Sequence, residues 1–564
     1  MSDDDLDADD DMRRLMEDSL LKNQISTTTF REFVQKAKRC KIKGISKLAK
    51  IKEGKHLKRD VFRAILKHRR VEVPMWYVDL PLQGGSAKIP FILPHLIIKK
   101  VESFSLGLKP LMFNPSAASS SSGSVELSLF NRVKATAADL GLAPETAESV
   151  IGLGLHGDGT PYGKKDSLEV LSLNFSFCEE HRKLRIPLIA LPQRHMTAET
   201  WNVVLETIAW SFKILAHGRV FEGPGFSDPL NKKALGFAPA GTLVPRSFLV
   251  QLRADWAFLK ICYKLPQHNE NIGICHLCRA TPQNWMEFDD DATWRSQRFT
   301  VADSFHKHQQ EKKIKPCPLW QIPGVSCALI DLDWLHAADL GVAADIAGNV
   351  FEAVLPHMAG TNNSQRVDKL RSELEDWYKS ENISEKIDRL KLESWRTSTD
   401  SGKAGAPKLK AKAAAIRHLV PFLHHIARKT FLDPDDQYGQ AIVALTSNLS
   451  DAYDCLNNWN QAKLATSVRK TLKLYKSLRQ HALRQDDQTK KWHLKPKCHV
   501  WLEMAEYESV TKGNPKHSWC YKDEDFGGYL VKVTARRGGR NVARSVSLNV
   551  YERFFALNRL PKFF

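Results

Sequence analysis

The order of apolar and polar residues along this chain predicts strands in one region and helices in most of the others. Within residues 149–265, the runs SVIGLGLHGD, SLEVLSLNFSF, RKLRIPLIALP and RSFLVQLRAD have the length and composition of strands. The run TAETWNVVLETIAWSFKILAHG begins with a Thr cap and ends on Gly218, which predicts a helix of about six turns. The predicted order is three strands, a helix and a fourth strand.

Helical periodicity dominates downstream, in runs such as DIAGNVFEAVL and SQRVDKLRSELEDWYKS. We therefore predict a mixed α/β fold in which a large, mostly α-helical insertion, residues 266–490, separates 149–265 from a final segment, 491–564. A Ser-rich stretch from Pro115 to Ser124 and a second stretch from Arg396 to His418 have little capacity to pack, so they predict loops or boundaries.

The N-terminal part divides into three predicted segments. Residues 1–11 form an acidic tip that we expect to be disordered, residues 12–75 a basic helical region, and residues 76–148 a connection that contains the Ser-rich linker. From Lys36 to Arg70 there are 15 Lys and Arg residues, with apolar residues at roughly helical spacing. This region is a DNA-contacting module, for example one similar to a helix-turn-helix, or else it is a solvated helical face or a nuclear-import signal.

The net charge of the chain indicates the class of partner that it binds. The chain has 564 residues and a formal net charge of +19, which favours a polyanion such as nucleic acid. No apolar run approaches about 18 residues, so a membrane span is not expected. The start of the chain lacks the apolar core of a secretory signal, and the cysteines are scattered except for Cys275 and Cys278. Reduced thiols in the cytoplasm or nucleus follow.

Three carboxylate residues lie in three separate segments of the chain. Asp158 lies at the end of the first predicted strand, Asp255 at the end of the fourth, and Glu524 far downstream in SWCYKDEDFGGYL, where Asp523 and Asp525 are alternatives. The strand order, with an acid on the first strand and another at the end of the fourth, matches the opening of a ribonuclease-H-like fold. Carboxylates that such a fold brings together can hold two divalent cations for phosphodiester chemistry.

Each acid alone also has a structural interpretation. Asp158 can belong to a turn, Asp255 can face water at a strand end, and Glu524 can be a charge favoured at a helix N-terminus. The combination of the three in strand and helix settings favours the metal site.

Two further motifs carry possible ligands. Cys275 and Cys278 have the spacing of half a zinc site, although two reduced cysteines near a core are the alternative. The candidates for the remaining zinc ligands are His306, His308, Cys317 and His336. Asp333 and His336 lie three residues apart, on one side of a predicted helix. They are either a pair beside the catalytic centre or a helix-capping Asp with a hydrogen-bonded His.

The C-terminal part contains several basic residues that can contact phosphates or can form a solvated tail. They are Lys495, Lys497, Arg536, Arg537, Arg540 and Arg544.

Several of these motifs are similar to those of one enzyme family. GLHGDGTPYGKKDSLEVLSLNF resembles the first-aspartate segment of CACTA-type cut-and-paste transposases, and ADWAFLKICYKLP with the following GICHLC resembles their second-aspartate strand and CxxC. DWLH is similar to their Asp/Cys-x-x-His element, and LKPKCHVWLEM with GNPKHSWCYKDEDF resembles the region around their final glutamate. The similarity extends, as short islands, over about the last three-quarters of the chain.

The resemblance implies a DDE-type enzyme of the ribonuclease-H-like superfamily that cleaves and transfers DNA strands. Asp158, Asp255 and Glu524 would then be the triad that binds Mg²⁺ or Mn²⁺, and Cys275 and Cys278 would contribute to zinc binding. It further implies transposon-end DNA as the partner, a homo-oligomer and a nuclear location. Two alternatives remain: an inactive transposase-derived protein that binds nucleic acid, and a ribonuclease-H-fold nuclease.

Overall fold

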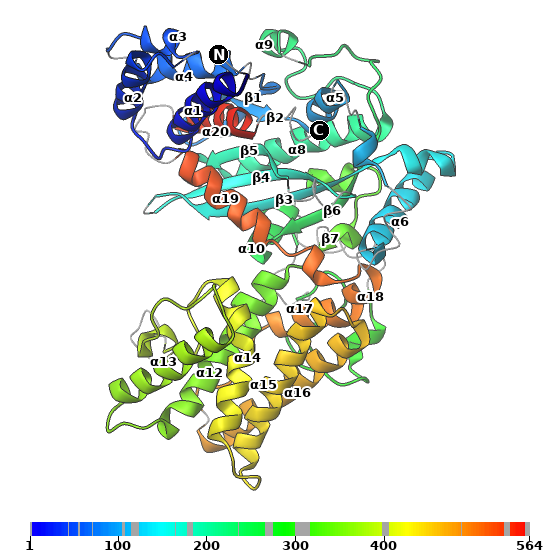
Figure 1. Cartoon of the computed structure of the whole chain (residues 1–564). Helices are drawn as coiled ribbons and strands as arrows, with labels where there is room; N and C mark the ends of the chain where they lie inside the picture. Colours follow the sequence, from blue (N-terminus) through cyan, green and yellow to red (C-terminus); the bar gives the residue numbers. More distant parts are fainter. Residues whose placement is uncertain are drawn as a thin grey trace.

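In the computed structural model the chain forms two lobes joined at a narrow waist (Figure 1). The sheet lobe contains both termini, and the helical lobe is built from the middle of the chain (Figure 1). The structure describes residues 3–558 except for 43, 55–56, 70–71, 104–107, 114–122, 164, 178–183, 235, 266–273, 299–315, 397–404, 487 and 535–541. No described helix is long and apolar enough to cross a membrane.

A mixed five-stranded sheet, with strand order β5-β4-β3-β6-β7, is the centre of the sheet lobe. Its strands are β3 (Ile151–Pro161), β4 (Ser167–Phe175), β5 (Ile186–Pro192), β6 (Ser247–Ala254) and β7 (Ile330–Asp331). Pairing is antiparallel from β3 through β4 to β5, and parallel from β3 through β6 to β7. The four predicted strands are confirmed. Strand β7 was not predicted, because two residues are too few to show a period.

Helix α8 (Ala198–His217) makes the crossover from β5 to β6. Its ends follow the predicted signals: Thr197 and Thr200 form a capping box, and Gly218 ends the helix with φ 71°. Its apolar side packs into the core of the sheet, where Ile208 is fully buried. The predicted succession of three strands, a helix and a fourth strand is therefore correct.

Further elements complete the sheet lobe. They are the hairpin β1 (Met75–Leu82) and β2 (Gly85–Ile92), and the helices α5 (Pro94–Glu102), α6 (Gly123–Asp139), α9 (Pro229–Lys232), α10 (Trp256–Tyr263), α19 (Tyr521–Thr534) and α20 (Val542–Asn558). Helix α20 lies along β5, where Ser547 donates a hydrogen bond to the carbonyl of Ala190 at 2.8 Å. Helix α19 crosses the sheet against β3, so the last part of the chain completes this lobe (Figure 1).

The basic N-terminal region folds into helices, as its apolar spacing predicted. They are α1 (Asp3–Leu21), α2 (Thr27–Arg39), α3 (Ser46–Ala49) and α4 (Leu57–His68), and their shared core includes Ala556 of α20. Helix α1 begins at Asp3, so the acidic tip is largely helical where we expected disorder. Asp10, at the end of the tip, pairs with Arg14 one turn later at 2.5 Å, a contact that favours the helix at this point.

The helical lobe has its own hydrophobic core. Its helices are the π-helix η8 (Leu335–Ala343), α12 (Ala344–Val354), α13 (Asn363–Ser380), α14 (Ala413–Thr430), α15 (Gln437–Asn457), α16 (Gln461–Gln485), α17 (Lys497–Glu503), the π-helix η11 (Met504–Glu508) and α18 (Ser509–Thr511).

Two predicted boundaries shift, and a third falls largely outside the described residues. Trp492 and Trp501 are buried in the core of the helical lobe, so this lobe extends past residue 490 and the sheet lobe resumes with α19. Within the predicted flexible stretch, residues 397–404 lie outside the described residues, and α14 begins at Ala413 because its apolar face packs into the same core. Most of the Ser-rich stretch, residues 115–122, lies outside the described residues, and α6 begins at Gly123.

Candidate active site

Asp158 and Asp255 lie side by side where the parallel pairing of β3 with β6 ends. In the register of β3 and β6, Gly157 is the partner of Ala254, and each acid follows directly. Both side chains are half-buried. A Cβ on Gly157 would lie 2.1 Å from the ring of Phe258, so glycine is needed for α10 to pack this close to β3. Asp255 also caps α10, since the N–H of Phe258 donates to its carboxylate at 2.6 Å.

Glu524, in the first turn of α19, completes the group of acids. It contacts Asp158 closely enough that burial, followed by the negative charge of Asp158, raises the pKa of Glu524 to about 8. Its Oε1 lies 3.5 Å from Nε2 of His336. The structure therefore brings the third acid to the first although their residue numbers differ by 366.

The charges of this group fit a cation. Like charges that are partly desolvated favour protonation, which is what the raised pKa of Glu524 reflects. A bound divalent cation reverses that preference, because it favours the ionised carboxylates. The oxygens of Asp158, Asp255 and Glu524 do not all lie within 4.8 Å of one another, in contrast to two tighter groups elsewhere in the described part of the chain. The three acids therefore do not form a closed set of ligands in this structure.

Asp333 and His336 lie directly beside the acids. Asp333 holds the imidazole through a 2.5 Å contact between its Oδ2 and Nδ1 of His336. Burial disfavours the charged ring, but the hydrogen bond and charge of Asp333, followed by the charge of Glu524, raise the pKa of His336 to about 9. Asp333 also accepts from the backbone N–H of His336 at 3.2 Å, so both sequence interpretations, helix cap and neighbour of the site, describe the pair.

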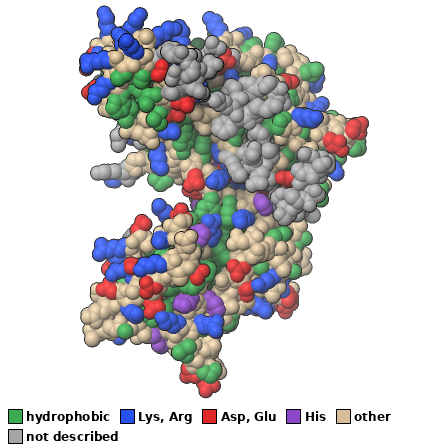
Figure 2. Space-filling model, viewed as in Figure 1, with side chains coloured by type: hydrophobic (Ala, Val, Ile, Leu, Met, Phe, Trp, Pro, Cys, Tyr) green, Lys and Arg blue, Asp and Glu red, His purple; other side chains and the backbone are tan. Residues whose placement is uncertain are grey.

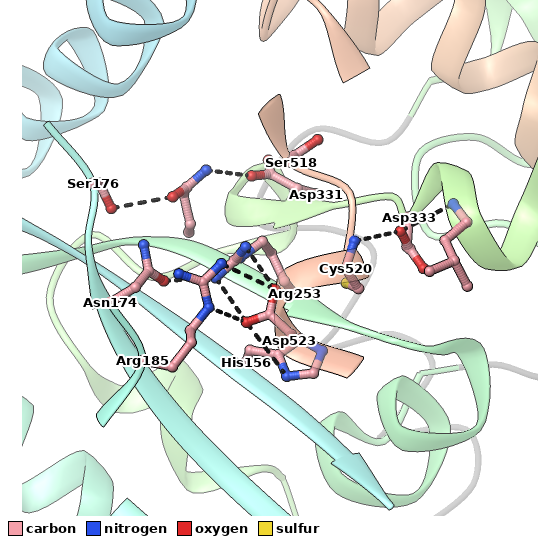
Figure 3. Close-up of polar contacts among 12 residues, drawn as sticks. His156, Asn174, Ser176, Arg185, Arg253, Asp331, Asp333, Ser518, Cys520 and Asp523 are labelled. Carbon is pink, nitrogen blue, oxygen red and sulfur yellow. Dashed lines mark hydrogen bonds and ion pairs between the residues drawn. The ribbon is translucent and has the colours of Figure 1, made fainter. Parts of the chain in front are cut away.

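Asp523 is tied into the core by two arginines, which separates its role from that of Glu524 (Figure 3). Arg185 donates to its Oδ2 at 3.2 Å and Arg253 donates to the same oxygen at 3.0 Å. Burial opposes ionisation, but the charges of Arg253, His156 and Arg185 hold the pKa of Asp523 well below its ordinary value. Asp525 is exposed, so among the three neighbouring acids only Glu524 contacts Asp158 and His336.

The anchoring of Asp523 also explains the direction of Glu524. Successive helical residues point about 100° apart, so a carboxylate fixed under α19 turns the next side chain toward the strand ends. Gly527 allows the close approach of this helix, since a Cβ there would lie 2.2 Å from Oγ1 of Thr160. At the start of α19, the N–H of Cys520 donates to Asp333 at 2.9 Å (Figure 3). Asp333 therefore positions both His336 and the helix that carries Glu524.

His156, Cys520 and Asp523 place potential ligand atoms within 4.8 Å of one another. The two guanidinium groups on Asp523 already neutralise this carboxylate and repel a cation. We therefore interpret the group as a buried ion-pair network.

A second cluster contains the CxxC pair. Cys275, Cys278, His499 and Glu503 are buried and offer four potential ligand atoms within 4.8 Å of one another. Cys278 Sγ lies 3.3 Å from Nε2 of His499. These residue types are the ones that zinc prefers, and the structure thus shows a group that can hold a metal ion.

The partners of the CxxC pair differ from those that we expected. Cys317 is buried in the core of the sheet lobe, and His336 belongs to the acid site. His306 and His308 lie outside the described residues. The useful signal was the spacing of His499 and Glu503, one turn apart on α17, which puts both on the same face of a helix. This signal was not recognised because both residues are far from the two cysteines in the sequence.

The predicted basic residues fall into two groups. Lys495 and Lys497 lie near the acids: Lys497 donates to the backbone carbonyl of His336 at 2.8 Å, and Lys495 pairs with Asp345 at 2.6 Å. Arg544 instead lies over the ring of Tyr77 on β1, 5.6 Å from its centroid, and does not join them. Arg536, Arg537 and Arg540 lie outside the described residues.

A further acid near the site, Glu169, was not predicted from the sequence. Glu169 on β4 pairs with Gly159, and a Cβ on this glycine would lie 2.8 Å from the Glu169 carboxylate. Burial, together with the charges of Asp158 and Asp255 and against a hydrogen bond from Ser167, raises the pKa of Glu169 to about 7. The alternating pattern of the strand placed Glu169 correctly on β4, but no motif marked it.

No protein-family model matches the chain, and no curated protein matches it significantly.

Proposed function

We propose that the protein is a DDE-type transposase-like enzyme that cleaves and transfers DNA strands with divalent cations. The observation that carries the proposal is the placement of Asp158 on β3 and of Asp255 directly after the neighbouring strand β6, with Glu524 in the first turn of α19 in contact with Asp158. The succession of strands and the crossover helix support a ribonuclease-H-like core around them. The helical lobe, inserted between the second acid and the third, agrees with the predicted insertion.

In this proposal the three acids hold Mg²⁺ or Mn²⁺, which prefer carboxylate oxygens. A pair of such cations activates an attacking water or 3′-hydroxyl and stabilises the leaving oxygen of a phosphodiester. Asp158 and Glu524 contribute adjacent carboxylates, and Asp255 contributes the third from the neighbouring strand. His336, held by Asp333, keeps Glu524 turned toward Asp158.

The charge of the chain supports DNA as the substrate. The formal net charge is +19, and the basic helices α2 to α4 lie in the sheet lobe, where Figure 2 shows Lys and Arg side chains gathered at its upper edge. We propose transposon ends as the DNA, a nuclear location, and a homo-oligomer that joins two ends.

We further propose that Cys275, Cys278, His499 and Glu503 hold a structural zinc ion. All four residues are buried, which is typical of a closed site that supplies no reaction centre. The ion would link the CxxC segment to α17. From α17 the chain continues to the start of α19, where Glu524 lies. The zinc site would therefore support the acid site indirectly.

The test is nicking of supercoiled DNA by the full chain with and without Mg²⁺. Substitutions Asp158→Asn, Asp255→Asn and Glu524→Gln remove charge with little change in shape, and Asn at residue 255 can still cap α10. Each is expected to abolish nicking, while the matched control Asp525→Asn, at an exposed neighbouring position, retains it. Nicking that survives all three substitutions contradicts the proposal. DNA binding without any nicking would favour a non-catalytic binding protein.

A further inference from the structure

A cavity of about 400 Å³ opens at the waist, next to Asp255 and His336. Its walls come from the start of α10, the π-helix η8 and the segment leading into α17, so both lobes contribute. In Figure 2 the surface is indented between the lobes, with acidic, basic and histidine side chains near the indentation. Pockets that hold small organic ligands have volumes of about 300–1,000 Å³, so this cavity has room for one.

Two lysines line the cavity together with the carboxylates of Asp255 and Asp333. They are Lys495 and Lys497, and both lie near the carboxylate of Asp345. Lys408 lies close to them. Burial lowers the pKa of Lys497 most, and the positive charge of Lys408 lowers it further. Three ammonium groups therefore gather around Asp345, and their combined charge exceeds that of the carboxylate. Such a group attracts an anion.

Another part of the wall is aromatic. Trp256, the first residue of α10, is half-buried, lines the cavity and packs against the core of the helical lobe. Trp256 follows Asp255 directly in the sequence, so its aromatic ring belongs to the residue next to one of the three acids. Aromatic side chains stack on nucleic-acid bases with little regard to sequence, because every base has a flat face.

From this juxtaposition we infer that the cavity receives one nucleotide of the bound strand, with its phosphate at Lys495 and Lys497 and its base beside Trp256. The inference rests on the proposed function, since it assumes a phosphodiester at the acids. Asp255 belongs both to the acid site and to the cavity wall, so the captured nucleotide is next to the one that is cut. The preferred substrate is then a strand with an unstacked nucleotide at the cleavage point.

Binding can be measured without catalysis. The full chain is titrated in EDTA, by calorimetry, with the 5′-phosphorylated dinucleotide of deoxyadenosine and with an analogue in which hydrogen replaces both bases. We expect the analogue to bind about tenfold more weakly, the size of effect that loss of stacking produces. Trp256→Leu should remove this difference, and Lys497→Gln should weaken both probes. The matched control Lys490→Gln, at an exposed position outside the cavity, should change neither affinity.

A blocking substitution keeps the test independent of folding. Ala257 lines the cavity but is exposed, so Ala257→Trp is expected to fold and to reduce dinucleotide affinity at least tenfold. Equal affinity for the two probes, or dinucleotide binding unchanged by Ala257→Trp, overturns the inference. Nicking is assayed separately with Mg²⁺. Dinucleotide binding that follows these expectations in a chain unable to nick DNA contradicts the proposed function and leaves the cavity assignment standing.

Discussion

Nε2 of His336 lies 3.5 Å from Oε1 of Glu524, and this contact joins the π-helix η8 of the helical lobe to α19 of the sheet lobe. Oδ2 of Asp333 contacts the other ring nitrogen, Nδ1, and this contact fixes the orientation of the imidazole. The position of Glu524 therefore depends on a residue that belongs to the other lobe. Insertion of the helical lobe between the second and third acids thus has a direct consequence for the geometry of the site.

Replacement of His336 by glutamine tests this dependence. We expect His336→Gln to lower Mg²⁺-dependent nicking about 10- to 100-fold, the range for residues that orient metal ligands. The Mg²⁺ concentration for half-maximal nicking should rise as well, which a general loss of folded protein would not cause. His481→Gln, on α16 and away from the site, serves as the control. A lowered rate with an unchanged Mg²⁺ requirement contradicts the positioning role.

Asp523 should matter to stability. Its removal leaves Arg185 and Arg253 buried without their carboxylate, which typically costs about 3–5 kcal/mol. We expect Asp523→Leu to lower the free energy of urea unfolding by this amount, and Asp525→Leu, at an exposed position, to have little effect. Equal stability of the two variants would show that the buried network is not needed to hold α19.

The sequence predicted the sheet better than it predicted the surroundings of the acids. The strands β3 to β6 and the helix α8 carry their own periodicity and caps, so their order and the placement of Asp158 and Asp255 could be derived locally. The choice of Glu524 over Asp523 could not be derived, because it depends on two distant arginines. Arg253 precedes Asp523 by 270 residues and Arg185 precedes it by 338. The partnership of Cys278 with His499 is likewise a property of the folded helical lobe.

The cysteine cluster leads to a prediction about metal content. We expect the purified protein to contain about one zinc ion per chain, as a four-ligand structural site requires. Cys278→Ser should lose the zinc and lower the melting temperature, while Cys40→Ser, at an exposed cysteine outside the cluster, should retain both. The measurements are elemental analysis and thermal unfolding. Stoichiometric zinc in Cys278→Ser, or its absence from the unmodified protein, would contradict the assignment.

Asp339 in η8 predicts a dependence of stability on pH. Tyr453 and Tyr521 each donate a hydrogen bond to its carboxylate at 2.5 Å, and these contacts tie α15 and α19 to η8. Burial nevertheless raises the pKa of Asp339 to about 7, against the two hydrogen bonds and the charge of Arg417 and with a smaller contribution from Asp333. In the unfolded chain the pKa of this group returns to its ordinary value of 3.8.

Between these two values the folded chain keeps a proton on Asp339 that the unfolded chain has released. Rising pH therefore favours unfolding, and the stabilisation from the protonated form, complete below about pH 4, is lost by about pH 7. The slope from one such group is at most about 1.4 kcal/mol per pH unit.

We expect Asp339→Asn to flatten the pH dependence of the unfolding free energy across this window relative to the unmodified protein. Glu169 and Glu508, whose pKa values are also raised to about 7, titrate in both proteins and cancel in the comparison. Parallel pH profiles of the two proteins would contradict the prediction.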